Sequence, residues 1–360
     1  MNIMTTVMLV FSLLGAFDRI IGNRFGIGKE FEKGFMMFGA NALSMIGMIV
    51  ISPWIADTLS PVFTVVREAL HLDPSLIPAM LFANDMGGAS LSAAIAADEQ
   101  LGLFNGLVIS SMMGATISFT IPYSLEVVSS KQHRWLLLGL LCGIVTIPFG
   151  CFGAGLMSGI PLGPLLYNLL LLQIFSVIIA VGLLKFPGTC IKIFGAFAFV
   201  IKMIITIGLA IGIVQFLTGI QLIKNMSTLE EGAAICLNSS VVMSGAFPLI
   251  YILSKVLVRP LGIVSKRLGI NETSALGFLS SLATNITTFG MMEKMDDKGA
   301  RLNSAFAVSA AFVFAGHMAF TMAFDASYVG PVIVGKLIAG VLALFFANFI
   351  YQYKSDPMER

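Results

Sequence analysis

The sequence predicts an all-α protein that crosses a membrane many times, with about nine transmembrane helices. Of its 360 residues, 57% are hydrophobic and 11% are charged, whereas a typical soluble domain has about 25% charged residues. Because one crossing takes about 20 apolar residues, the chain is long enough for roughly ten crossings. The 21 basic and 19 acidic residues nearly balance, so no surface for nucleic acid is expected. The composition excludes a soluble enzyme and makes the lipid bilayer the expected partner.

Nine apolar runs have the length of a membrane span. They lie near residues 3–22, 35–53, 103–124, 134–157, 164–185, 192–218, 231–253, 302–322 and 328–350. The first run lacks the basic start and the small-residue cleavage site of a signal peptide, so it counts as a span. Cys142, Cys151, Cys190 and Cys236 lie in or beside these runs without CxxC spacing. They are expected to pack as small apolar side chains, and neither a metal site nor a cofactor is expected.

Two other segments are apolar overall but have polar residues and helix breakers at their centres. We name residues 75–97 the first interrupted segment and residues 273–292 the second interrupted segment. The central residues are Asn84-Asp85-Met86-Gly87-Gly88 in the first and Thr284-Asn285-Ile286-Thr287-Thr288 in the second. Each is expected to enter the membrane and return to the side from which it came, as a re-entrant hairpin. The loops of the chain then fall into two sets.

The distribution of basic residues over these loops predicts the orientation of the chain. The loops at 18–33, 125–134, 185–192, 254–272 and 293–301 carry 4, 2, 2, 4 and 3 Lys or Arg. The loops at 54–74, 98–102, 158–163, 219–230 and 323–327 carry 1, 0, 0, 1 and 0. Cytoplasmic loops are enriched in Lys and Arg. The expected topology therefore has nine crossings, an N-terminus outside the cell membrane and a cytoplasmic C-terminus.

The chain also has a weak internal repeat. A shift of 198 residues superimposes Glu32 and Glu230, Gly34 and Gly232, Met45 and Met243, Gly47 and Gly245, Asp98 and Asp296, and Asn105 and Asn303. With a small gap Asn84 also falls on Asn285, so the interrupted segments occupy equivalent places. We expect one integral membrane domain (1–360) that comprises repeat 1 (3–157), a connecting helix (158–191), repeat 2 (192–350) and a cytoplasmic tail (351–360).

The expected hairpins make the two repeats inverted, because five crossings then separate equivalent elements. Inverted repeats with interrupted elements at matching positions are typical of secondary transporters. In such proteins the solute binds between the interruptions, near the middle of the bilayer. The sequence therefore predicts a small-solute site where the two interrupted segments meet.

Asp85 is the first candidate for a solute-binding residue. An acidic side chain near the centre of the bilayer is costly and usually faces a cavity. It lies between Asn84 and the pair Gly87 and Gly88, where an unwound backbone can leave carbonyl groups free. A carboxylate beside an amide and free carbonyls suits a small cation that also forms hydrogen bonds. The alternatives are that Asp85 caps a half-helix or forms a static ion pair with Lys202.

The second interrupted segment offers Asn285, Thr287 and Thr288, which carry hydrogen-bonding groups but no charge. An ammonium group is expected to bind on the Asp85 side and a hydroxyl on the Asn285 side. The alternative is that these three side chains satisfy their own interrupted backbone, which finds no water inside the bilayer.

Three further polar residues, His317, Glu126 and Asn41, lie within spans or at their ends. They are candidates for proton transfer or gating, although His317 could equally be a buried structural residue. Lys202 and Lys336 also lie inside spans, and both are expected to extend their ammonium groups toward the interface.

Seven motifs occur in collinear order between about residue 16 and residue 350. They are Glu32-Lys33-Gly34-Phe35-Met36, Asn84-Asp85-Met86-Gly87-Gly88, Ser110-Ser111-Met112-Met113-Gly114, Gly143-Ile144-Val145-Thr146-Ile147-Pro148, Gly290-Met291-Met292, Ala305-Phe306-Ala307-Val308-Ser309-Ala310-Ala311-Phe312 and Val334-Gly335-Lys336-Leu337-Ile338. As a set they resemble the bacterial ethanolamine utilisation permease family, EutH. The resemblance implies a transporter of the cytoplasmic membrane that imports ethanolamine.

Ethanolamine is largely protonated at neutral pH, so the site predicted from the residues fits this substrate, with an ion pair expected at Asp85. If the cation moves alone, an inside-negative potential of 100 mV favours uptake by about 2.3 kcal/mol, and no coupling ion is required. The alternatives are a carrier for another small amine or an ion-coupled polar solute, and a non-transporting sensor or anchor of the ethanolamine utilisation system. The chain has no HExxH, P-loop or serine-protease motif, so an enzyme is not expected. By analogy with other carriers, a homodimer is a further expectation.

Overall fold

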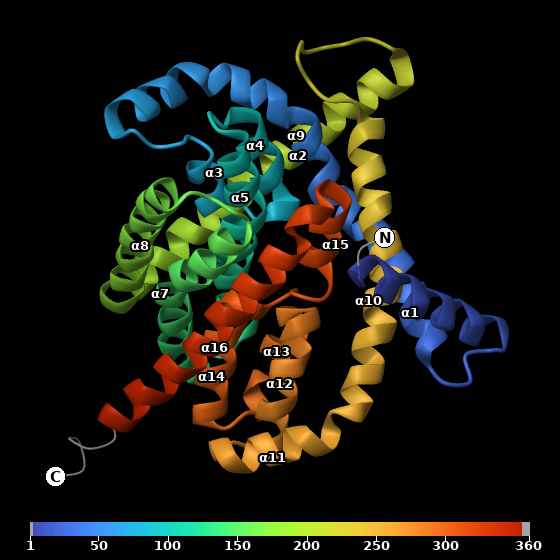
Figure 1. Cartoon of the computed structure of the whole chain (residues 1–360), viewed down its shortest axis with the longest axis vertical. Coiled ribbons are helices and arrows are strands. Elements are labelled where there is room, and N and C mark those ends of the chain that lie inside the picture. The colour runs from blue at the N-terminus through green and yellow to red at the C-terminus, as the bar shows by residue number, and fades with distance from the viewer. Residues whose placement is uncertain (1–2, 355–360) are drawn as a thin grey trace.

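The computed structural model describes residues 3–354, and these residues form helices joined by short loops (Figure 1). Eight helical runs in this part of the chain are long and apolar enough to cross a membrane. They are α1 (Ile3–Ile20), α2 (Ile27–Leu70), the run Glu99–Val127, α7 (His133–Met157), α8 (Leu162–Lys185), α9 (Pro187–Thr218), α10 (Leu229–Val256) and α16 (Val329–Lys354). The expected all-α, multi-pass membrane fold is confirmed. Of the expected tail, residues 351–354 complete α16, and residues 355–360 lie outside the described residues.

Shorter helices lie between these runs. They are α3 (Leu76–Leu81), α4 (Gly88–Ile95), α5 (Glu99–Phe104), α6 (Ile121–Val127), α11 (Val258–Leu268), α12 (Glu272–Ala283), α13 (Asn285–Gly290), α14 (Asp297–Ala310) and α15 (Gly316–Phe324). Between α5 and α6 the helix continues as two π-helical segments, Asn105–Gly114 and Thr116–Thr120. Wider turns of this kind are rare and occur frequently at functional sites.

Helix α2 is much longer than its expected span of 35–53. It extends over 44 residues and contains Pro53 and Pro61. The expectation of a loop from residue 54 is therefore wrong. Each proline removes one backbone hydrogen bond and bends a helix, but the flanking apolar residues let the helix resume. Figure 1 shows the resulting curve of α2 across one end of the molecule.

The expected span 302–322 is not a continuous helix, and this prediction is wrong. The chain leaves the helical conformation between α14 and α15, where Phe312 has a φ of 62°. The backbone amides of Phe312 and Phe314 donate to the carbonyls of Ser281 and Leu282, each at 3.0 Å. These carbonyls belong to the end of α12, so a distant part of the chain supplies the bonds that an unbroken helix would have made.

The two ends of each interrupted segment lie close together. The backbone amides of Ala97 and Asp98 donate to the Asp73 carboxylate at 3.1 and 2.9 Å. In the second segment the backbone amide of Asn271 donates to the Asp296 carboxylate at 2.8 Å. Each carboxylate therefore holds the start of its segment next to the end.

Several helices cross at backbone contact, with glycine at the crossing point. A Cβ atom on Gly47 of α2 would lie 1.9 Å from the carbonyl oxygen of Ile205 in α9. A Cβ on Gly245 of α10 would lie 2.1 Å from the carbonyl oxygen of Met8 in α1. Because lipid is as apolar as leucine, close packing through small residues is a main source of helix association in membranes.

We expect Gly47→Ala to destabilise the protein, because the added methyl group forces α2 away from α9. Overpacking of this kind costs about 1–3 kcal/mol. The matched control is Gly39→Ala on the same helix, where a Cβ meets no atom within 4 Å. The measurement is the thermal unfolding midpoint in detergent, and equal midpoints for the two variants would contradict the close crossing.

Candidate functional site

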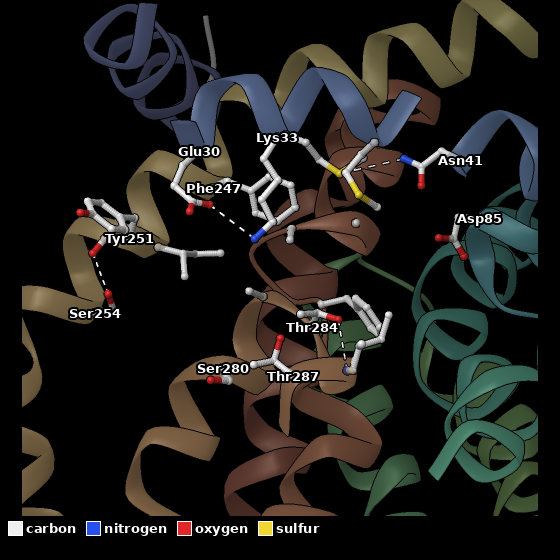
Figure 2. Close-up of a pocket in the computed structure, with 18 residues that line it drawn as sticks. Glu30, Lys33, Asn41, Asp85, Phe247, Tyr251, Ser254, Ser280, Thr284 and Thr287 are labelled. Carbon is white, nitrogen blue, oxygen red and sulfur yellow. Dashed lines mark hydrogen bonds and ion pairs between the residues drawn. The ribbon is translucent and has the colours of Figure 1, made fainter. Parts of the chain in front are cut away.

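A cavity of about 450 Å³ lies between α2, α10 and three interruptions of the helical backbone. The interruptions contribute Asp85, Thr284 with Thr287, and Phe312. Figure 2 shows Asp85 at one end of this cavity and Tyr251 with Ser254 at the opposite end. Thus the cavity joins residues that lie up to 286 positions apart in the chain, from Glu30 to Gly316.

Helices α2 and α10 each present one face to the cavity. Lys33, Met37 and Asn41 follow one another at intervals of three to four residues along α2, which places them on the same side of the helix. Met243 and Phe247 do the same on α10. These walls are largely apolar, and their polar groups lie at particular points, as in most small-molecule sites.

The end of the cavity near Tyr251 carries exposed charge. The Lys33 side chain is 59% exposed, and its ammonium group lies 3.5 Å from the Glu30 carboxylate. The same ammonium group lies 5.0 Å from the centre of the Phe247 ring, which lines the cavity. This end of the cavity therefore carries exposed charged side chains.

Asp85 lies in a single 3-10 turn, Asn84–Met86, between α3 and α4. Gly87 follows it with a φ of 106°, and a Cβ at Gly87 would lie 2.1 Å from the side chain of Met48. Only glycine fits this position, because other residues disfavour that φ. The turn leaves the Asp85 side chain half-buried at the cavity wall. Within residues 3–354 the carboxylate forms no salt bridge.

Thr284 and Thr287 provide hydroxyl groups on the wall formed by the second interrupted segment. The Thr284 hydroxyl accepts a hydrogen bond from the backbone amide of Ile286 at 3.2 Å, so it caps α13. Thr287 is exposed toward the cavity. The structure therefore brings a carboxylate from the first interrupted segment and a hydroxyl from the second to one cavity.

The other predicted residues of the interrupted segments lie behind the cavity wall. Asn84 is fully buried, and its amide donates to the carbonyl of His317 at 3.4 Å. Asn285, also fully buried, donates to the Thr120 hydroxyl at 3.0 Å. Thr288 donates to the carbonyl of Gly277 at 3.1 Å. These bonds connect the interruptions to neighbouring helices.

Gly88 allows close packing behind Asp85. A Cβ on Gly88 would lie 1.7 Å from the Ser110 hydroxyl and 2.4 Å from the carbonyl oxygen of Phe82. Ser110 belongs to the first π-helical segment, and its hydroxyl donates to that same carbonyl. The absence of a side chain at Gly88 therefore allows the π-helical segment Asn105–Gly114 to pack directly against the Asp85 turn, on the side away from the cavity.

The three candidates for proton transfer or gating occupy different environments. Asn41 lines the cavity, and its amide lies 4.0 Å from the sulfur of Met243. Glu126 is exposed on α6 and does not line the cavity. His317 is buried, and its ring lies 4.8 Å from the ring of Phe312.

Lys336 contradicts the expectation that it extends to the interface. Its side chain is fully buried, its ammonium group donates to the carbonyl of Ser111 at 2.6 Å, and it lies 3.1 Å from Nδ1 of His317. Lys202 is exposed on α9 and forms no salt bridge within the described residues. The static pair of Lys202 with Asp85 is therefore not present.

Sequence reasoning missed Phe312 and Thr284 as cavity residues and Lys336 as a buried cation. Residues 311–315, which form the interruption at Phe312, are all apolar, and tertiary hydrogen bonds hold them out of the helical conformation. For Lys336 a signal was available, since it lies well inside an apolar run and could have been paired with His317. Within residues 3–354 no group of three His, Cys, Asp or Glu side chains is arranged to hold a metal ion.

Comparison with known proteins gives consistent matches over almost the whole chain. The family described as "Ethanolamine utilisation protein, EutH" matches residues 1–350. The "Probable ethanolamine permease EutH" of Listeria monocytogenes is 41% identical over 343 residues, which cover 95% of this chain and 92% of that protein. A protein of the same name from Salmonella typhimurium is 38% identical over 97% of this chain and 95% of its own length. No solved structure matches the chain significantly.

We expect Thr287→Cys to react with a small, water-soluble thiol reagent, because Thr287 faces the cavity. Thr288→Cys is the matched control, since the neighbouring side chain is fully buried. Reaction of the four native cysteines is measured in the unsubstituted protein and subtracted. Equal labelling at the two positions would contradict the assignment of the cavity wall.

Proposed function

Because the chain belongs to the EutH family of ethanolamine utilisation proteins, we propose that it is a permease that imports ethanolamine by alternating access. We propose further that the substrate binds as the protonated amine, with its ammonium group at Asp85. The observation that carries this proposal is the Asp85 carboxylate, which faces a cavity of about 450 Å³ without a salt-bridge partner. An acidic side chain inside a membrane span usually faces a cavity and has a function, and its negative charge at the cavity wall would attract a small cation.

The cavity offers complementary groups for both ends of ethanolamine. The ammonium group would donate to Asp85 at one end of the cavity. The hydroxyl would bond to Thr287 on the opposite interruption once the two interruptions close around the substrate, because ethanolamine is short. Phe312, whose ring also lines the cavity, adds an aromatic face that attracts cations. The role of Asn84, Gly87 and Gly88 would be to hold the backbone of the Asp85 turn in its conformation.

Asn285 and Thr288 would act indirectly in this arrangement. Both are fully buried and bond to neighbouring helices. They would hold the second interruption so that the Thr287 hydroxyl stays on the cavity wall. An Asn41 amide at the cavity wall would provide one more polar contact as the substrate enters.

The alternating-access mechanism would rest on two inverted repeats, 3–157 and 192–350, each containing a re-entrant hairpin. The hydrogen bonds that join the two ends of each interrupted segment support this proposal. Asp73 and Asn271 precede the two segments and are 198 residues apart. Asp98 and Asp296 follow the segments and are also 198 residues apart. The glycine crossings support it as well. Gly47 brings α2 against α9, and Gly245 brings α10 against α1, which is a reciprocal contact between the proposed repeats.

The proposed orientation places the N-terminus outside the cell and the C-terminus in the cytoplasm. The end of the cavity with exposed charged side chains lies at Glu30 and Lys33, in the part of the chain that is rich in basic residues. Because cytoplasmic loops carry the excess of Lys and Arg, this conformation would be open to the cytoplasm. Transport would require a second conformation that opens on the other side.

We expect Asp85→Asn to abolish saturable ethanolamine uptake while the protein stays folded. The amide keeps the shape of the side chain but removes its charge, and the affinity for a cation should fall at least tenfold, about 1.4 kcal/mol. The measurement is uptake of labelled ethanolamine into proteoliposomes that contain only this protein. Glu68→Gln, which removes a carboxylate from an exposed position of α2, is the matched control.

Three outcomes would contradict the proposal in different ways. Unchanged uptake by Asp85→Asn would exclude Asp85 as the counter-charge. Uptake of a different amine or of a polar solute in preference to ethanolamine would change the substrate. A folded protein without any uptake above empty liposomes would favour a sensor or anchor.

We expect Thr287→Val to weaken ethanolamine binding and to leave ethylamine binding unchanged. The substitution removes the hydroxyl that would bond to the substrate, and one such hydrogen bond contributes about 0.5–1.5 kcal/mol, roughly a three- to tenfold change in affinity. Competition of unlabelled ethanolamine and ethylamine for uptake measures both affinities. Thr206→Val, at an exposed position of α9, is the control, and equal losses for both amines would exclude recognition of the hydroxyl.

A further inference from the structure

Lys336 belongs to a buried cluster that the proposed uptake does not yet use. It is fully buried on α16, where its ammonium group donates to the carbonyl of Ser111 and lies 3.1 Å from Nδ1 of His317. A lysine ammonium group has donors only, so Nδ1 must accept this hydrogen bond and the imidazole must be neutral. Lys336 and His317 therefore share one positive charge between them.

Asp85 supplies the negative charge that balances this cluster. The turn that carries Asp85 lies against the cluster, because the side-chain amide of the neighbouring Asn84 donates to the carbonyl of His317 at 3.4 Å. Within residues 3–354 Asp85 forms no direct salt bridge with Lys336. Cys151 of α7 is a further titratable side chain near Lys336. The π-helical segment Asn105–Gly114 contributes a carbonyl and contains no titratable side chain.

Helix α14 also packs against α16, but its charges lie elsewhere. Its three charged residues, Asp297, Lys298 and Arg301, all fall within its first five positions. The guanidinium of Arg301 lies 5.8 Å from the centre of the Trp135 ring. The charge balance around Lys336 therefore rests on Asp85 and the shared proton.

The cluster adjoins the cavity through His317. The ring of His317 lies 4.8 Å from that of Phe312, and both Phe312 and Gly316 line the cavity. Lys336 itself does not line the cavity. Thus the His317 ring, which contacts the buried ammonium group, also lies beside a residue of the cavity wall, and Asp85 lies on the same wall.

A cationic substrate changes the charge of this region. With Asp85 ionised and Lys336 protonated, the two side chains of the empty carrier together carry no net charge. Binding of a protonated amine at Asp85 would leave one excess positive charge in a region of low dielectric, where uncompensated charge is strongly unfavourable. Loss of one proton from the pair of Lys336 and His317 restores neutrality.

We infer that binding of protonated ethanolamine at Asp85 releases one proton from Lys336 through His317, so that the carrier exchanges one ammonium ion for one proton. This inference rests on the proposed function. The proton moves from Nζ of Lys336 to the imidazole of His317 and from there to the water of the cavity. When the amine leaves on the other side, Lys336 takes up a proton again and neutralises Asp85. No net charge crosses the membrane.

The exchange predicts that a membrane potential does not drive accumulation. The test uses the full chain in proteoliposomes with equal pH on both sides and a potassium diffusion potential of about −100 mV inside. A cation that moves alone would accumulate roughly fifty-fold under this potential, whereas the exchange gives the same internal concentration with and without it. Potential-driven accumulation by the unsubstituted protein would overturn the inference.

Transport of the neutral amine would also be independent of the membrane potential, so the first experiment does not distinguish it from proton exchange. The Lys336→Met variant distinguishes the two. The variant lacks the exchangeable proton, so the cation would cross with its charge, and we expect accumulation to become potential-driven, up to roughly fifty-fold. Lys202→Met, at an exposed position of α9, should behave like the unsubstituted protein. Folded Lys336→Met protein whose uptake stays independent of potential would overturn the inference in favour of neutral amine.

The inference can still be tested if the Lys336→Met variant fails to fold. If Lys336→Met does not fold, Lys336→Gln keeps a donor toward the Ser111 carbonyl and lacks the exchangeable proton, and it carries the same expectation. Absence of saturable uptake by the unsubstituted protein would overturn the permease proposal itself. Saturable uptake that follows the potential would overturn only the proton exchange.

Discussion

The interior of a bilayer contains no water, so every backbone group that leaves a helix there must find its partner within the protein. The interruptions around the cavity meet this requirement by bonding to other elements. The amides at Phe312 and Phe314 bond to the end of α12. The amide of Ala83 bonds to the hydroxyl of Ser118 at 3.1 Å, and the carbonyl of Phe82 accepts from Ser110. The hydrogen bonds of these backbone groups therefore fix the positions of the interrupted segments relative to the neighbouring helices.

The same constraint applies to charge. Asp85 and Lys336 lie in a region where either charge alone would be strongly unfavourable, and each reduces the cost of burying the other. Their environments differ, since Asp85 faces the cavity and Lys336 is fully buried. Under the proposed mechanism a solute would reach the anion but not the cation. This asymmetry would favour cations and place the compensating charge behind the cavity wall.

Much of the candidate site could be predicted from the sequence. Asp85, Asn41 and Thr287 were expected from polar residues in apolar surroundings, and all three line the cavity. The resemblance of the motifs to the EutH family is confirmed by the family match over residues 1–350. Phe312 could not be predicted, because an apolar residue in an apolar run gives no local sign that its amide bonds to Ser281. Lys336 was misjudged, since a lysine inside a span can either extend to the interface or be buried against a partner.

The sequence by itself determined the all-α membrane class, eight of the nine expected spans and the positions of the two interrupted segments. These features follow from local composition, which determines the free energy of transferring each segment from water into lipid. The tertiary structure decided the length of α2, the interruption between α14 and α15, and which side chains face the cavity. It also decided the burial of Lys336 beside His317. These features depend on contacts between residues far apart in the chain, and hydropathy carries no information about such contacts.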